Sequence, residues 1–166
     1  FANYYDLIYS WKDYKKEAAA LNKLIRRYRH SKGKKLLEVA CGTGNYIQYF
    51  KDDYSVVGTD LSPDMLRIAR HRFPQVPLVE GDMCELDLKE TFDVILCLFS
   101  SIGYLKTYTN LRKTLQRFAK LLNPGGVILI EPWFEPSMYQ VGSPHMNTYS
   151  DVDVKIARLC VSRLVR

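Results

Sequence analysis

Residues 36–46, LLEVACGTGNY, constrain the fold of this chain more than any other stretch. A short apolar run carries one acidic residue, Glu38, and leads into a loop of small residues that holds Ala40, Gly42 and Gly44. In parallel α/β sheets, a strand followed by a glycine-rich loop and a helix forms a binding site for a nucleotide-like cofactor. The stretch therefore predicts an α/β fold with a cofactor at the end of its first strand.

Strand and helix patterns alternate along most of the remaining chain. Short apolar runs predict strands at 35–40, 55–60, 77–82, 92–99 and 127–133. Helical spacing and start signals predict helices at 13–30, 44–51, 63–73 and 109–122. Gly33 is expected to end the first of these helices, and NPGG at 123–126 to form a turn. This alternation predicts a doubly wound parallel sheet with helices on both faces.

The two ends of the chain differ in sequence pattern from this central part. We expect residues 1–34 to form an N-terminal helical cap over the cofactor site and residues 35–133 to form the α/β core. Residues 134–166 show rough apolar alternation, which predicts an antiparallel segment acting as a lid or a dimer edge. The chain lacks an initiator Met and stops inside a strand-like pattern, so we expect the native protein to be longer.

Composition narrows the class of protein. The chain has 166 residues, of which 47% are hydrophobic and 25% charged, which is typical of one globular domain. No stretch approaches the roughly 20 apolar residues that a membrane span needs, and no signal peptide is recognisable. Its four cysteines form no CxxC pair, and with three histidines they offer no metal-ligand spacing. We expect a cytoplasmic protein with free thiols and no metal.

The loop itself argues against a dinucleotide. The G-x-G-x-x-G fingerprint would require glycine where this chain has Asn45. Glu38 would repel a diphosphate, but its carboxylate can accept hydrogen bonds from an ammonium group. An amino acid joined to a nucleoside suits this loop better than a dinucleotide does.

Acidic residues also follow the second and third strands. Asp60 can accept hydrogen bonds from two ribose hydroxyls. Asp82 can accept from the exocyclic amine of an adenine, and Met83 can pack on its ring. Each residue alone has an ordinary explanation, such as a cap, a turn or a surface acid. Together, at successive strand ends and without a phosphate clamp, they favour S-adenosylmethionine as the cofactor.

The same residues resemble a known family. The segments LLEVACGTGNY, VVGTDLSPDML, EGDM, FDVILCLFSSIGYL and LLNPGGVILIEPW resemble class I S-adenosylmethionine-dependent methyltransferases. More narrowly, YDLIY with KDY, FSSIGYL and EPWF look like the N,N-dimethyltransferases of nucleotide-linked deoxysugars, the desosamine type. The family's sheet has seven strands, whereas five are recognisable here, so we expect the core to be truncated after the fifth.

The resemblance implies a set of cofactor contacts. It places Glu38 near the methionine amine, Asp60 on the ribose hydroxyls, and Asp82 with Met83 at the adenine. Tyr9 and Tyr14 would close over the methionine end, with core packing as the alternative reading of both. The remaining implied contacts are Ala40, Gly42, Gly44, Asn45, Leu61, Met65 and Leu98.

The residues that would assist the reaction are less clearly marked. Tyr104 stands where some relatives carry histidine, which leaves the proton acceptor open. We name Tyr104 and Tyr9 as catalytic candidates, with Glu131 as another residue near the strand ends. Trp133 either walls the substrate pocket or fills the core.

Methylation of a small-molecule amine is the function that these features favour. A net charge of +6 also allows a nucleic-acid methyltransferase, and the dense basic patch lies at residues 15–35. The [DN]PP[YF] sequence typical of base-amine methylation is absent after the fourth strand, however. A catalytically silent cofactor-binding module is the third reading, and a homodimer is a further expectation.

Overall fold

The computed structural model describes residues 1–138 and 141–163. The chain forms two compact units. We call Asp13–Trp133 the core unit. The segments Phe1–Lys12 and Phe134–Arg166 together make the other, which we call the flanking unit.

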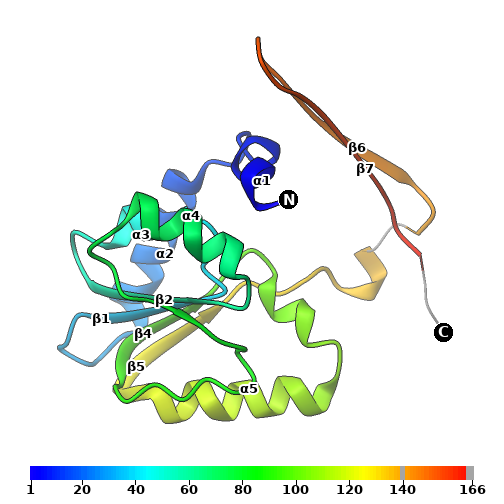
Figure 1. Ribbon diagram of the computed structural model, residues 1–166. Helices are drawn as coiled ribbons and strands as arrows, with labels where there is room; N and C mark the ends of the chain where they lie inside the picture. Colours follow the sequence, from blue (N-terminus) through cyan, green and yellow to red (C-terminus); the bar gives the residue numbers. More distant parts are fainter. Residues whose placement is uncertain (139–140, 164–166) are drawn as a thin grey trace. The chain divides into compact units, whose positions relative to one another are not determined.

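A parallel sheet of five strands forms the centre of the core unit (Figure 1). Its strands lie in the order β3-β2-β1-β4-β5, and every neighbouring pair is parallel. The strands are β1 (Lys35–Val39), β2 (Ser55–Asp60), β3 (Leu78–Glu80), β4 (Phe92–Cys97) and β5 (Leu122–Ile130). This arrangement confirms the doubly wound α/β fold predicted from the sequence.

Helices cover both faces of this sheet (Figure 1). The α-helices of the core unit are α2 (Tyr14–Tyr28), α3 (Ile47–Phe50), α4 (Pro63–Arg72) and α5 (Tyr108–Leu121), and η1 (Ser101–Leu105) is a short 3₁₀ helix. The side chains of Asp13, Ser62 and Thr107 cap α2, α4 and α5 by accepting backbone N–H groups. These caps define where the three helices begin.

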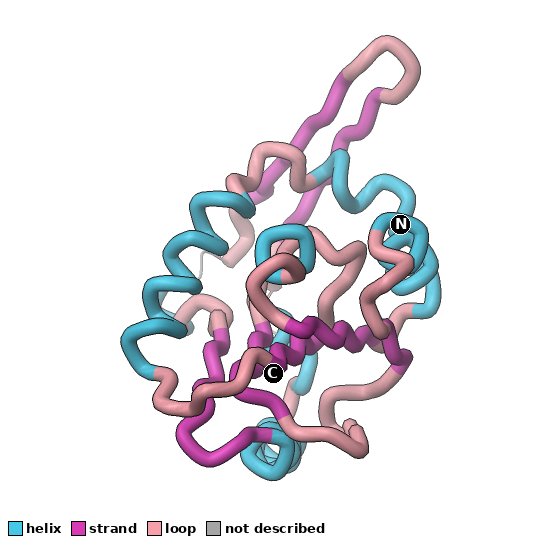
Figure 2. Tube along the Cα trace, turned by 90° about the vertical axis from the view of Figure 1, so that its left-hand side faces the viewer, coloured by secondary structure: helices cyan, strands magenta, loops and turns pink. Residues whose placement is uncertain are grey.

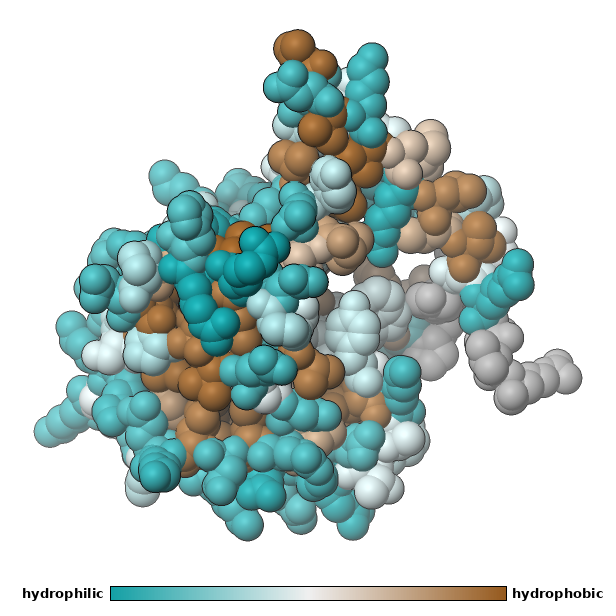
Figure 3. All heavy atoms as spheres, viewed as in Figure 1, coloured by the Kyte–Doolittle hydropathy of each residue, from teal (hydrophilic) through white to brown (hydrophobic). Residues whose placement is uncertain are grey.

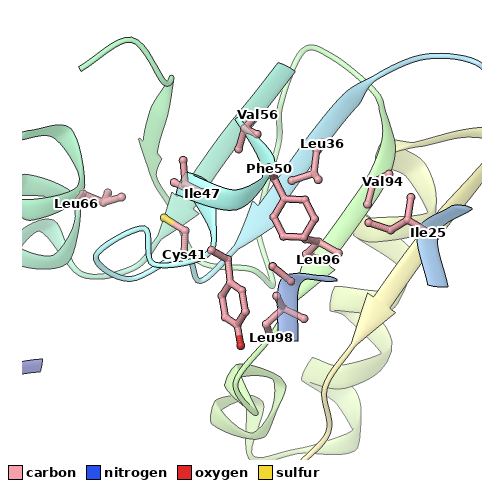
Figure 4. Close-up of a cluster of buried hydrophobic side chains, with 12 residues drawn as sticks. Ile25, Leu36, Cys41, Ile47, Phe50, Val56, Leu66, Val94, Leu96 and Leu98 are labelled. Carbon is pink, nitrogen blue, oxygen red and sulfur yellow. The ribbon is translucent and has the colours of Figure 1, made fainter. Parts of the chain in front are cut away.

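Two buried clusters fix the helices to the sheet. In β1, Leu36 points to the cluster shared with α2, α3 and α4, and Leu37 to the cluster shared with α5. Successive strand residues face opposite sides, so one strand supplies both clusters. Figure 4 shows Phe50 of α3 beside side chains of β1 and β4 in the first cluster.

Two predicted helices are shorter than their patterns. The helix expected at 13–30 ends at Tyr28 rather than at Gly33, because the N–H groups of His30 and Ser31 donate to Gly125 O instead. The helix expected at 44–51 is only α3, since Gly44, at φ +82°, keeps the preceding residues in a turn. Long-range hydrogen bonding and a left-handed residue therefore overrule helical spacing.

The fifth strand is longer than predicted. β5 begins at Leu122 and includes the NPGG sequence that was expected to form only a turn. Leu122 pairs with Phe92 and Val127 pairs with Val94, so the register shifts between them as it does at a β-bulge. The NPGG residues therefore lie within the strand, where they shift its register, rather than in a turn that precedes it.

The flanking unit contains a helix and an antiparallel hairpin. Its elements are α1 (Ala2–Ile8), η2 (Pro136–Met138), β6 (Pro144–Ser150) and β7 (Lys155–Val161). Strands β6 and β7 form their own two-stranded sheet, which Figure 2 shows as neighbouring strands joined by a loop. This confirms the antiparallel segment predicted outside the core sheet.

Hydrophobic side chains lie on the surface of this hairpin (Figure 3). Met146 on β6 is 61% exposed, and Leu159 on β7 is 65% exposed. Across residues 1–138 and 141–163, no helix combines the length and apolarity needed to cross a membrane.

Replacing Phe50 by Ala tests the first cluster. The Phe50 side chain is fully buried, and we expect its truncation to lower the free energy of unfolding by about 3–5 kcal/mol in urea titrations. The control is Leu24→Ala on α2, where the side chain is 41% exposed and the expected loss is below about 1 kcal/mol. Equal losses for the two variants would contradict this account of the core.

Candidate cofactor-binding site

The candidate site lies at the carboxyl ends of β1, β2 and β3. Glu38 is paired in register with Gly58 of β2 and Leu96 of β4, and Asp60 is the last residue of β2. Gly81 N–H donates to Asp60 O at 3.0 Å, so the segment after β3 begins beside the end of β2. The structure thus brings the predicted acidic positions to one edge of the sheet, where ligands of open α/β sheets bind.

The loop after β1, residues 40–45, has an unusual backbone. Ala40, Gly42 and Gly44 all have left-handed φ angles, of 55°, 57° and 82°. Such a conformation costs roughly 1 kcal/mol or more for a residue with a Cβ, so Ala40 is strained where the two glycines are not. At Gly44 a side chain is also excluded by space, because an added Cβ would lie 2.8 Å from the Phe73 ring. We call residues 40–45 the cofactor loop.

Asp60 holds the cofactor loop against the start of α4. Its Oδ2 accepts from Gly42 N–H at 2.7 Å, and its Oδ1 accepts from Ser62 N–H at 2.8 Å. A carboxylate has about four lone-pair sites, so each oxygen keeps capacity for a further donor. Asp60 therefore shapes the site and can still accept hydrogen bonds from two hydroxyl groups.

Glu38 is a buried acid without a partner for one of its oxygens. Glu38 is only 2% exposed, and its Oε2 has no hydrogen-bond partner within the part of the chain that the structure describes. Burial, and secondly the charge of Asp60, raises the pKa of this carboxyl from 4.5 to about 8. A cationic group placed beside Glu38 would satisfy the oxygen and ionise the acid.

The third acidic position is more open. Asp82 is exposed, and its Oδ1 accepts from Cys84 N–H at 2.8 Å, which makes a local turn. Met83 is half-buried and packs against the cluster under α5. The structure therefore presents a carboxylate next to an apolar side chain, as the sequence predicted, while the role of Asp82 toward an adenine stays a prediction.

Three further predicted contacts differ in their exposure. Leu61 follows Asp60 and is 66% exposed, so its side chain is available to a ligand. Met65 is half-buried on α4. Leu98 follows β4 and is buried in the cluster beneath α2 and α3. Exposure at Leu61 suits a contact with a ligand, whereas Leu98 packs within the protein.

The loops after β4 and β5 are joined to each other. Phe99 N–H donates to Glu131 Oε2 at 2.7 Å, and Ser100 Oγ donates to Pro132 O at 3.0 Å. Phe99 and Ser100 both have left-handed φ angles, of 52° and 58°. Tyr104 follows on η1 and is 80% exposed. Glu131 thus holds a strained loop, a role that sequence reasoning did not assign to it.

A pair of tyrosines packs beside the cofactor loop. The rings of Tyr14 on α2 and Tyr46, the residue after the loop, meet edge to face with centroids 5.1 Å apart. Tyr46 OH donates to the Glu17 carboxylate. Burial, and secondly this hydrogen bond, raises the pKa of Tyr46. Tyr14 therefore packs near the loop, and its expected role over the methionine end stays a prediction; Tyr46 and Glu17 are partners that the prediction missed.

Tyr9 belongs to the flanking unit. Its hydroxyl accepts from Arg158 Nη1 of β7 at 2.7 Å, and that guanidinium also lies over the Tyr9 ring, 5.7 Å from the centroid. This contact ties the segment before the core unit to the hairpin after it. The expected role of Tyr9 over the methionine end stays a prediction.

Comparison with known proteins agrees with this geometry. Residues 36–126 match the family model described as a methyltransferase domain. The chain belongs to this methyltransferase domain family. The match spans the strands and loops that form the site, so the resemblance inferred from the sequence motifs is confirmed.

Individual relatives narrow the comparison. The chain is 43% identical over 144 residues to a dTDP-3-amino-3,6-dideoxy-alpha-D-glucopyranose N,N-dimethyltransferase of Streptomyces fradiae, covering 85% of this chain and 56% of the relative. It matches the crystal structure of Streptomyces venezuelae DesVI with a TM-score of 0.91 and 36% identity, over 99% of this chain and 71% of that one. It also matches SAM-bound CalS10, an amino pentose methyltransferase from Micromonospora echinaspora, with a TM-score of 0.83 and 35% identity, over 93% and 66%.

This methyltransferase domain chain spans little more than half the length of the curated relative from Streptomyces fradiae. Its hydrogen-bond acceptors nevertheless suit S-adenosylmethionine. Glu38 offers a buried carboxylate for an ammonium group, and Asp60 offers acceptors for two hydroxyls.

Glu38→Gln should stabilise the cofactor-free protein by an amount that grows with pH. The pKa of Glu38 is raised to about 8 in the folded protein. The folded protein therefore has its full stability below pH 4.5, where Glu38 is protonated, and loses stability as the pH rises through 8. Gln cannot ionise, so the variant should gain on the order of 4 kcal/mol over the parent at about pH 9 and little at about pH 4. Urea titrations at both pH values measure the difference.

The matched control is Glu80→Gln, at the end of β3, where the acid is exposed. We expect no pH-dependent gain for this variant. A gain for Glu38→Gln that does not change with pH would contradict the burial of a titrating acid.

Proposed function

We propose that this chain is the catalytic core of an S-adenosylmethionine-dependent N-methyltransferase that acts on the amino group of a nucleotide-linked sugar. The observation that carries the proposal is Glu38, a buried acid with an unpartnered oxygen near the carboxylate of Asp60. The relative from Streptomyces fradiae is named for an amino sugar of this kind, and CalS10 was solved with SAM bound.

Cofactor recognition follows from the three strand ends. Glu38 would hold the ammonium group and Asp60 the ribose hydroxyls, while Asp82 would accept from the adenine amine. Bound S-adenosylmethionine supplies an electrophilic methyl group, so the main task of the protein is to align the acceptor with it. Such positioning can contribute roughly 7–11 kcal/mol to lowering the barrier.

The acceptor amine must be neutral to react, so a group that takes its proton assists the reaction. Tyr104 is our candidate in the core unit, since it is exposed on η1 after β4, next to the site edge. Tyr9 is the candidate in the flanking unit. Glu131 is a weaker choice, because its Oε2 already accepts from Phe99 N–H.

A nucleic-acid substrate is not favoured. The dense basic patch includes the last turn of α2 and the residues that precede and start β1, such as Lys34 and Lys35. These positions lie at the amino end of β1, whereas Glu38 and the cofactor loop lie at its carboxyl end. This part of the basic patch is therefore not gathered around the candidate site, and the relative from Streptomyces fradiae is named for an amino sugar.

A homodimer and a cytoplasmic location stay predictions. The hairpin supports the first, because β6 and β7 form a sheet of two strands and carry exposed apolar residues. A sheet with open edges and apolar side chains is suited to pairing with a second copy.

Asp60→Asn tests the cofactor site. The amide nitrogen would face either Gly42 N–H or Ser62 N–H, so one hydrogen bond is lost and a charged acceptor becomes neutral. We expect the Kd for S-adenosylmethionine to rise by about 30-fold or more in calorimetric titrations. Asp64→Asn, at an exposed position in the first turn of α4, should change the Kd by less than about twofold. Unchanged binding by Asp60→Asn would overturn the assignment.

A panel of acceptors tests the substrate class. Release of S-adenosylhomocysteine should accompany incubation with nucleotide-linked amino sugars, and free amino acids and RNA should give only background. Methyl transfer to RNA, or tight binding of NADH by the parent protein, would refute the proposal.

A further inference from the structure

One arginine joins the end of α4 to the cofactor loop. Arg72 Nη1 donates to Thr43 O at 2.9 Å, to Thr43 Oγ1 at 3.4 Å and to Asn45 Oδ1 at 2.9 Å. Thr43 is only 1% exposed, so its carbonyl depends on a hydrogen-bond donor inside the protein. The guanidinium is thus a bridge between a helix and three oxygens of the loop.

The neighbouring residue braces the same loop from another side. The Phe73 ring lies so close to Gly44 that a Cβ added there would be only 2.8 Å from it. The Arg72 guanidinium lies 5.2 Å from the centroid of the same ring. Arg72 and Phe73 together close off one side of residues 43–45. At the other end of α4, Ser62 N–H donates to Asp60. Helix α4 therefore touches the candidate site at both of its ends.

We propose that Arg72 is a positioning residue for the methionine end of the cofactor, and that Asn45 accepts a hydrogen bond from Arg72 rather than contacting the cofactor. Arg72 acts through the cofactor loop by holding the orientation of the peptide at Thr43 and the side chain of Asn45. Asn45 had been assigned to the cofactor itself. The inference rests on the proposed function, because it concerns how that site binds S-adenosylmethionine.

The loop needs such an anchor because its backbone is strained. Ala40 holds a left-handed conformation despite its Cβ, and the loop follows it through two left-handed glycines. Strained conformations persist where surrounding contacts enforce them. Without Arg72, the Thr43 carbonyl loses a charge-assisted hydrogen bond in a buried place, and other loop conformations become competitive. Binding would then have to restore the ordered loop first.

The effect should fall on one half of the cofactor. The adenosine half is assigned to Asp60 and Asp82, whose carboxylates accept from the backbone N–H groups of Gly42, Ser62 and Cys84. The methionine half is assigned to the loop and to Glu38. A residue that merely supports the fold would weaken binding of both halves alike.

Arg72→Gln, measured with S-adenosylhomocysteine and with adenosine, separates these cases. We expect the Kd for S-adenosylhomocysteine to rise about tenfold, and the Kd for adenosine to stay within about twofold of the parent. In turnover, the KM for S-adenosylmethionine should rise while kcat changes little. Arg72→Lys keeps one charged donor and should recover part of the lost affinity.

Arg70→Gln is the matched control. Arg70 lies on the same helix and also donates to a backbone carbonyl, Leu78 O at 3.0 Å, but that carbonyl belongs to β3 rather than to the loop. Its removal should leave the ratio of the two affinities unchanged. If Arg72→Gln is poorly folded, Asn45→Ala removes one acceptor from the bridge and should shift the ratio in the same direction by a smaller factor.

Two results would overturn the inference. One is parent-like S-adenosylhomocysteine binding in folded Arg72→Gln and Asn45→Ala. The other is an equal loss of affinity for S-adenosylhomocysteine and adenosine. A parent protein that binds neither ligand would instead refute the proposed function, so the two failures are distinguishable.

Discussion

The arrangement of the site depends on the two hydrogen bonds accepted by Asp60. One oxygen holds the cofactor loop at Gly42 and the other holds the start of α4 at Ser62, so one side chain at the end of β2 sets the positions of both. The backbone adds a third link, since Gly81 N–H donates to Asp60 O and fixes the segment after β3. Asp60 is therefore a structural junction as well as a ligand candidate, and the same carboxylate explains part of the raised pKa of Glu38.

Most of the fold could be predicted from the sequence because its signals are local. The capped starts of α2, α4 and α5 depend on residues within one turn, and the buried strands are continuous apolar runs. Helix α3 and the end of α2 could not be predicted in the same way. Their limits are set by a left-handed glycine and by bonds to Gly125, which is far away in sequence.

The candidate site shows the same division. Glu38 and Asp60 could be predicted because strand ends in a parallel sheet meet at one edge. Arg72 could not, because nothing in the sequence of α4 tells which of its arginines turns toward the loop; Arg67, Arg70 and Arg72 differ only once the helix is placed. Glu17 was missed for the same reason, since its partner Tyr46 lies in another element.

The burial of Glu38 also links this site to the acidity of its surroundings. With a pKa of about 8, Glu38 is protonated near neutral pH when no ligand is bound. An ammonium group bound next to Glu38 would instead favour its ionised, carboxylate form. Occupation of the site would therefore expel a proton, and departure of the ligand would take one up again. Such an exchange makes the heat of association depend on which buffer receives the proton, and it makes a more alkaline compartment favour the occupied form.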